Sequence, residues 1–161
     1  MYNNYMIKLN NKNNIPNWDN YFMQIAKVVS KRSNCIRRST GAIIIKDNRI
    51  ISTGYNGTPR GIQNCNENGC KRCNSDNIKT GENLEECICS HAEENSIVQA
   101  AYHGVSLKNA TMYATNSPCI ICTKMIINAG IKKVIYLKKY KFNKLVESLF
   151  KQVNISFEKL L

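Results

Sequence analysis

The sequence predicts an α/β fold in which helices sandwich one mixed, five-stranded sheet. Short apolar, β-branched runs alternate with longer segments whose apolar residues recur at helical spacing. After a first helix, the expected order is two strands followed by three helix–strand steps. Each strand–helix–strand step is expected to cross over right-handed and to leave its two strands parallel. At 161 residues the chain has the length of one domain with a sizeable core.

The N-terminal segment carries no sustained apolar period. Residues 1–17 are rich in asparagine, so a disordered leader is expected there, followed by a domain over residues 18–161. From Trp18 the apolar residues return at three- and four-residue spacing, which predicts an amphipathic helix that ends between Lys31 and Asn34. Trp18 and Phe22 are expected to be core anchors of this helix.

A β-hairpin is expected next. Two apolar runs, residues 41–45 and 50–54, are separated by four polar residues, of which Asp47 and Asn48 readily take the turn conformations. Residues 54–61 form a loop because of their glycines and proline. Residues 62–90 are polar and carry cysteines, and the segment is too long for a simple connector unless a cross-link or a metal holds it together.

The rest of the chain supplies three further helix–strand pairs. The helices are predicted at residues 91–103, 119–129 and 143–152, and the strands at residues 111–115, 134–137 and 153–160. Gly104 and Gly130 end the first two of these helices.

The formal charge is +12, and half of it comes from residues 131–161. Lysines interleaved through strands and a helix are typical of a solvated face, although such charge also suits nucleic acid or a phosphorylated substrate. No apolar run approaches the roughly 20 residues of a membrane span, and the N-terminus lacks a signal-peptide core. We therefore expect a cytoplasmic protein without membrane contact, whose eight cysteines are reduced.

Two short motifs predict a catalytic zinc. One is His91-Ala-Glu93, and the other is Pro118-Cys119-Ile-Ile-Cys122. Cysteines three apart lie on one face of a helical turn, where both thiolates can reach one tetrahedral ion. With His91 as third ligand one position stays open for water, and Glu93 is placed to carry its proton. The alternatives for a lone Cys-x-x-Cys are a redox pair or half a zinc knuckle, but the two motifs together are the signature of zinc nucleobase deaminases.

The cysteine-rich insert, residues 62–90, predicts a second, structural zinc. Its ligands would be Cys65, Cys70 and Cys73, completed by Cys87 or Cys89, and the alternative is a set of reduced, unligated thiols. Metal binding would order a polar segment that has little apolar material to bury. Cys35 has no evident partner and is expected to be a small buried hydrophobe.

Three motifs carry a family resemblance: Gly54-Tyr55-Asn56-Gly57, His91-Ala-Glu-Glu-Asn95 and Ser117-Pro-Cys-Ile-Ile-Cys122. Over residues 18–160 the chain resembles the deoxycytidylate deaminases of the cytidine deaminase superfamily, and its cysteine insert resembles their fungal-type branch. The resemblance implies a three-layer α/β/α sandwich. It also implies zinc-dependent hydrolysis of dCMP to dUMP and ammonia, which feeds thymidylate synthesis.

The resemblance also implies roles for individual residues. Glu93 would move the protons, the backbone of Ala92 and Ser117 would hold the pyrimidine, and Asn56 would bond the sugar hydroxyl. The alternative is that Asn56 caps its own turn. The family implies homo-oligomers, as hexamers or built from dimers, activated by dCTP and inhibited by dTTP. An effector site near Gly54, Tyr55 and Gly57 would hold Mg²⁺ with the nucleotide.

Three arginines flank the hairpin and the glycine-rich loop. An arginine fork matches phosphate bidentately, so at least one of Arg37, Arg38 and Arg60 is expected to select the monophosphate or to grip an effector triphosphate. For each of them, the alternative is a solvated side chain.

Two rival functions follow from the same motifs. A nucleic-acid-editing deaminase, such as a transfer-RNA adenosine deaminase, shares both zinc motifs and suits the positive charge. The loop at residues 54–61 and the cysteine insert resemble the mononucleotide enzymes instead, which makes nucleic acid the less favoured partner. A non-catalytic zinc-binding or competence-type module is the second rival, and Glu93 argues against it, because a structural site needs no such carboxylate.

Overall fold

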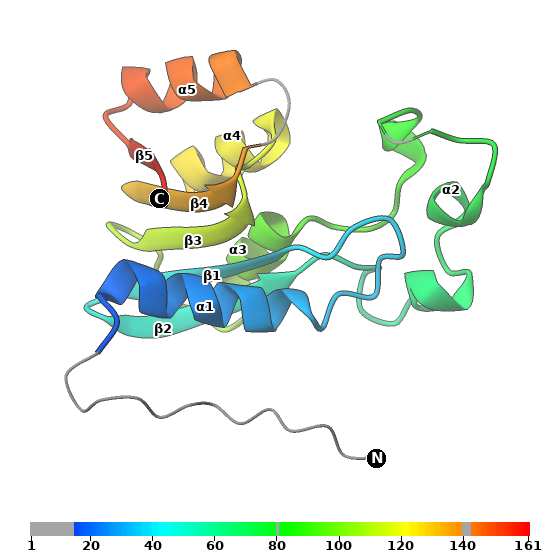
Figure 1. Cartoon of the computed structure of the whole chain (residues 1–161), viewed down its shortest axis with the longest axis horizontal. Helices are drawn as coiled ribbons and strands as arrows, with labels where there is room; N and C mark the ends of the chain where they lie inside the picture. The colour runs from blue at the N-terminus through cyan, green and yellow to red at the C-terminus, as the bar shows by residue number, and fades with distance from the viewer. Residues whose placement is uncertain (1–14, 80, 140–142) are drawn as a thin grey trace.

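The computed structural model describes residues 15–79, 81–139 and 143–161, and it has helices on both faces of one sheet (Figure 1). The predicted disordered leader falls largely on residues 1–14, which lie outside the described residues. The longer helices are α1 (Trp18–Ser30), α3 (Ala92–Tyr102), α4 (Ile120–Asn128) and α5 (Asn143–Gln152). The three-layer α/β/α sandwich expected from the sequence is confirmed.

The sheet of the described chain has the order β2-β1-β3-β4-β5. Its strands are β1 (Gly41–Lys46), β2 (Arg49–Tyr55), β3 (Thr111–Asn116), β4 (Lys133–Lys138) and β5 (Ser156–Lys159). β1 runs antiparallel to both β2 and β3, whereas β3, β4 and β5 are mutually parallel. Because β2 and β3 both oppose β1, the predicted parallel relation holds for every strand–helix–strand step.

Apolar side chains alternate between the two faces of the sheet. On one face Ile43 and Ile45 pack with Phe22 of α1. On the other, Ile44 packs with Ile126 of α4 and Phe150 of α5. Side chains alternate between faces along a strand and recur about every 3.6 residues along a helix, so the sheet has an apolar core on each of its faces.

The hairpin turn forms as predicted, because Asp47 and Asn48 take φ angles of 50° and 56°. The expectation that Trp18 is a core anchor is wrong. Trp18 is 55% exposed and stacks on Phe22, which is the buried anchor of α1. β5 begins at Ser156, later than predicted, because Asn154 turns the chain with a φ of 54°.

The cysteine-rich insert forms short helical turns at one side of the sheet (Figure 1). These are η1 (Cys65–Glu67), α2 (Lys71–Asn74) and η2 (Leu84–Glu86). The Arg37 side chain fastens the insert to the chain before β1, since its guanidinium donates to the carbonyl oxygens of Cys73 and Ser75. Within the described residues, no helix has both the length and the apolar character needed to cross a membrane.

Candidate active site

The sheet topology gathers the predicted site residues at one edge. β2 and β3 end at this edge and β1 begins there, since Gly41 pairs with Tyr55 and Ala42 with Ala114. The chain leaving β3 runs through Ser117 into α4, and the backbone N–H of Ser117 donates to the Lys138 carbonyl at 2.8 Å. The edge where parallel strands end is the usual ligand-binding place of an open α/β sheet.

His91 and Glu93 are held at the first turn of α3. His91 is the N-cap residue, and its backbone N–H donates to the Glu94 carboxylate at 3.0 Å, which closes a capping box. The helix lies directly on β2, because a Cβ atom at Gly54 would stand 2.2 Å from the Ala92 carbonyl oxygen. Gly54 therefore has a steric reason for being glycine, apart from the predicted effector contact.

The three predicted zinc ligands lie close together. His91 Nδ1 lies 3.4 Å from Cys119 Sγ and 3.4 Å from Cys122 Sγ. Zinc bonds of about 2.3 Å to sulfur and about 2.0 Å to nitrogen, at tetrahedral angles, place such atoms about 3.6 Å apart. The donor set and its spacing therefore fit one zinc ion.

The electrostatics of these groups favour metal binding. Hydrogen bonds from Cys122 and then from His91 lower the pKa of the Cys119 thiol to about 4. The Cys119 thiolate in turn raises the pKa of His91 to about 9. A site that already stabilises a thiolate is suited to a cation.

Glu93 is a buried carboxyl group beside the three ligands. Its side chain is 7% exposed, and its Oε2 lies 3.9 Å from Cys122 Sγ. Burial raises the pKa of Glu93 to about 7, so the group can both accept and donate a proton near neutrality.

A cleft of about 450 Å³ opens onto His91 and Glu93. Asn56 and Ser117, both predicted to hold substrate, line it. The Asn56 amide accepts a hydrogen bond from the Thr40 backbone N–H at 2.8 Å and donates one to the Arg38 carbonyl at 2.9 Å. Asn56 therefore fastens the start of β1 to the loop after β2, and its predicted sugar contact would use the remaining amide proton.

The arginines occupy different surroundings. Arg37 and Arg38 line the cleft. Arg60 lies outside this lining, with its guanidinium carbon 4.7 Å from the centroid of the Tyr102 ring. Arg72, which the sequence reasoning missed, also lines the cleft and is 6% exposed. Its guanidinium donates hydrogen bonds to the carbonyl oxygens of Glu82 and Lys79. No sequence motif predicts an arginine whose hydrogen bonds go to loop carbonyls.

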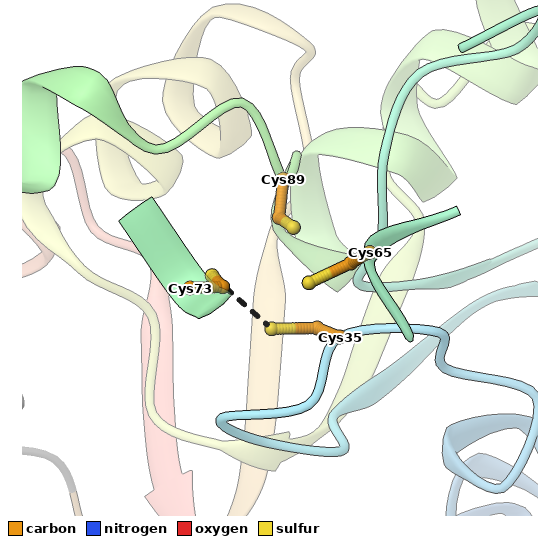
Figure 2. Close-up of side chains that lie close together, drawn as sticks. All are labelled: Cys35, Cys65, Cys73 and Cys89. Atoms are coloured by element: carbon orange, nitrogen blue, oxygen red, sulfur yellow. Dashed lines mark hydrogen bonds between the residues drawn. The ribbon is translucent and has the colours of Figure 1, made fainter. Parts of the chain in front are cut away.

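The structure groups the cysteines differently from the predicted set, because Cys65 and Cys70 fall into separate groups. Four of them, Cys35, Cys65, Cys73 and Cys89, form one group, and a second group consists of Cys70, Cys73, Cys87 and Cys89. In each group the sulfurs lie within 4.8 Å of one another. The expectation that Cys35 lacks a partner is wrong, because its Sγ lies 3.9 Å from Cys73 Sγ and its side chain is half-buried (Figure 2).

Backbone amides point at two of these sulfurs. A hydrogen bond with Cys89 and the backbone N–H groups of Arg37 and Arg38 lower the pKa of the Cys35 thiol to about 5. Burial raises the pKa of the Cys70 thiol, but the backbone N–H groups of Cys73 and Ile88 outweigh it and bring that pKa to about 7.

The fold and the site define a class of protein. Residues 16–138 match the family model described as the cytidine and deoxycytidylate deaminase zinc-binding region, and the chain belongs to this family.

Named relatives agree with this class. The chain is 42% identical to a deoxycytidylate deaminase of Schizosaccharomyces pombe over 91% of this chain and 45% of the relative. It is 40% identical to a deoxycytidylate deaminase of Saccharomyces cerevisiae over 88% of this chain and 44% of the relative. These yeast proteins fit the resemblance to the fungal-type branch, and the chain spans about half of their length.

A solved structure extends the similarity to three dimensions. The dCMP deaminase of cyanophage S-TIM5, in complex with dCMP and dUMP, has a TM-score of 0.75 and 32% identity over 91% of this chain and 99% of its own.

Proposed function

We propose that the protein is a zinc-dependent deaminase that hydrolyses dCMP to dUMP and ammonia. The observation that carries this proposal is the buried carboxyl group of Glu93 beside the converged ligands His91, Cys119 and Cys122. A metal site without catalysis would not need an acid in that place. The two yeast relatives bear the name of this activity, and the cyanophage relative binds its substrate and product.

Each residue has a defined part in this chemistry. His91, Cys119 and Cys122 would hold zinc, which when bound lowers the pKa of a water molecule towards neutrality. Glu93 would accept one proton from the water and give it to the ring nitrogen next to the reacting carbon, and would then carry the water's second proton to the departing amine. The backbone of Ala92 and Ser117 would hold the pyrimidine, with Asn56 at the sugar hydroxyl.

The basic wall of the cleft suits a nucleotide phosphate. Arg38 lines both the cleft and the lysine-rich hollow beside it. We assign the monophosphate contact to Arg38. Regulation by dCTP and dTTP, with Mg²⁺ at the effector site near Tyr55, and assembly into homo-oligomers belong to the same proposal.

Ammonia release from several substrates tests this function. dCMP, dCTP, deoxycytidine and cytosine are assayed side by side, and dCMP is expected to react fastest. Turnover of deoxycytidine at the rate of dCMP would contradict selection of the phosphate. Light scattering checks whether the protein forms homo-oligomers of one size. The ammonia assay checks whether added dCTP and dTTP change the turnover of dCMP.

The +12 charge keeps a nucleic-acid-editing deaminase as the second candidate. Lys27, Lys138, Lys139 and Lys144 line the hollow beside the cleft, which would suit a polynucleotide backbone. A cytosine- or adenosine-containing oligonucleotide in the same assay separates the two functions. Its deamination in the absence of dCMP turnover would favour the second.

A further inference from the structure

The buried centre of the cysteine-rich insert is made of sulfur. Among the described residues, this cluster contains Cys65, Cys70, Cys73 and Cys89, with Cys35 and Cys87 packed against it. Leucine, valine or phenylalanine would normally fill such a centre. A segment with so little apolar surface to bury gains its order from cross-links or from metal.

These thiols are free in the structure and lie at the spacing of metal ligands. Cys73 Sγ lies 3.7 Å from Cys87 Sγ and 3.9 Å from Cys35 Sγ. A disulfide needs about 2.05 Å. Two sulfurs bound to one tetrahedral zinc, with bonds of about 2.3 Å, lie about 3.8 Å apart. In Figure 2 the four labelled sulfurs, from separate segments of the chain, turn towards a common centre.

The two groups of four cysteines overlap. Cys73 and Cys89 belong to both, Cys35 and Cys65 only to the first, and Cys70 and Cys87 only to the second. One ion in the first group would leave Cys70, which is fully buried, without a ligand bond. One ion in the second would do the same to the fully buried Cys65. All six cysteine sulfurs bind metal only if the site holds two ions that share two of the sulfurs.

We propose that the insert holds a two-zinc, six-cysteine cluster in which Cys73 and Cys89 bridge the ions. Cys35 and Cys65 complete the coordination of one zinc, and Cys70 and Cys87 that of the other. This site is separate from the zinc at His91, and the proposal does not rest on the deamination of any substrate. Soft thiolate ligands in tetrahedral sets favour zinc among the common divalent metals.

The surroundings suit the charge of such a cluster. Six thiolates and two divalent ions carry a net charge of about −2. Arg37 donates to the Cys73 carbonyl at 2.6 Å, and the buried Arg72 lies within the insert's own α2. Backbone N–H groups point at the Cys35 and Cys70 sulfurs, as outer partners of metal-bound thiolates do.

The cluster would also support the active site. One residue, Ser90, separates the bridging Cys89 from His91. Ser90 is itself bridged to Gly57, with backbone bonds of 3.2 and 2.9 Å. Cys35, Cys73, Cys87 and Cys89 line the same cleft as His91 and Glu93. The cluster would therefore be one wall of that cleft, fixed to a zinc ligand.

The unaltered protein gives the first test. Metal analysis is expected to find three zincs per chain, and X-ray absorption at the zinc edge to show a zinc–zinc distance of about 3 Å, as two tetrahedra sharing two sulfurs require. Two zincs without a zinc–zinc signal would overturn the cluster, as would one zinc with disulfides by mass spectrometry. The colour and absorption of an iron–sulfur centre would overturn it too.

Variants assign the ligands. Cys35→Ser and Cys70→Ser each remove a ligand of one ion only, so each is expected to lower the zinc content by about one and to abolish the zinc–zinc signal. Cys119→Ser is the matched control: it should release the zinc at His91 but keep that signal. Full zinc content and an unchanged signal in Cys35→Ser would exclude Cys35 and the shared arrangement.

Discussion

Glu93 is buried beside the three predicted metal ligands. Replacing one carboxylate oxygen with an amide nitrogen tests its role in proton transfer. Glu93→Gln keeps the shape of the side chain but cannot take up a proton. Turnover of dCMP is expected to fall at least about 100-fold, while the zinc content stays that of the unaltered protein.

Ammonia release and metal analysis of the same preparation check this outcome. Glu147→Gln serves as control, because Glu147 lies at the surface, where it forms an ion pair with Lys139. A Glu93→Gln protein with more than about a hundredth of the original rate would contradict proton transfer by this group.

Arg38 lies where the cleft meets the lysine-rich hollow. Hydrogen bonds to charged groups contribute about 1.5–3 kcal/mol, so Arg38→Ala is expected to lower kcat/KM for dCMP by roughly 10- to 100-fold. Turnover of deoxycytidine, which lacks the phosphate, should change little.

Arg60→Ala and Arg37→Ala complete this comparison. Arg60 stacks on Tyr102 and does not line the cleft, so Arg60→Ala is the control. Unchanged dCMP kinetics and unchanged dCTP response in all three variants would exclude Arg37, Arg38 and Arg60 from nucleotide recognition.

At the scale of elements, the approach of β2 to α3 sets the position of the catalytic turn. A methyl group at Gly54 would meet the Ala92 carbonyl oxygen at 2.2 Å and the Ser96 backbone nitrogen at 2.4 Å. Because backbone atoms cannot move aside as side-chain ends can, Gly54→Ala is expected to destabilise the protein by about 1–3 kcal/mol and to displace α3.

Urea unfolding and dCMP turnover measure the two effects. Thr53→Ala is the matched control, since Thr53 is the exposed neighbour on the same strand. Equal stability of both variants would show that α3 does not depend on this close approach.

Local patterns decided which elements could be predicted. Helix α5 has the predicted bounds because its apolar residues recur at helical spacing. His91, Cys119 and Cys122 were predictable because each motif fixes its own helix start and the topology brings the starts together. Cys35 and Arg72 were not, since their contacts join distant segments without any period in the sequence. Trp18 matched the apolar period of α1, but at the first position of the helix the sheet does not cover it.

At the scale of the whole molecule, the sheet and the insert are stabilised differently. Three apolar clusters of described residues hold the sheet between its helices, whereas the described insert is centred on thiols. A strong zinc chelator is therefore expected to open residues 62–90 to proteases while the sheet stays folded.

Limited proteolysis with mass spectrometry, alongside circular dichroism, follows both parts. Re-addition of zinc should restore protection, and Cys73→Ser should show cleavage without chelator. An insert that resists proteolysis equally with and without zinc would owe its order to something other than metal.

The pairing of β1 with β3 also bears on how fast the chain can fold. Ile45 and Thr111 are 66 residues apart in the sequence, and the insert lies between them. If a metal cluster joins Cys35 to Cys89 before β1 pairs with β3, the effective length of the loop between Ile45 and Thr111 falls to about half. Each halving of a flexible loop lowers its closure cost by about 0.6 kcal/mol. The metal that orders the insert would thus also hasten the long-range pairing on which the centre of the sheet depends.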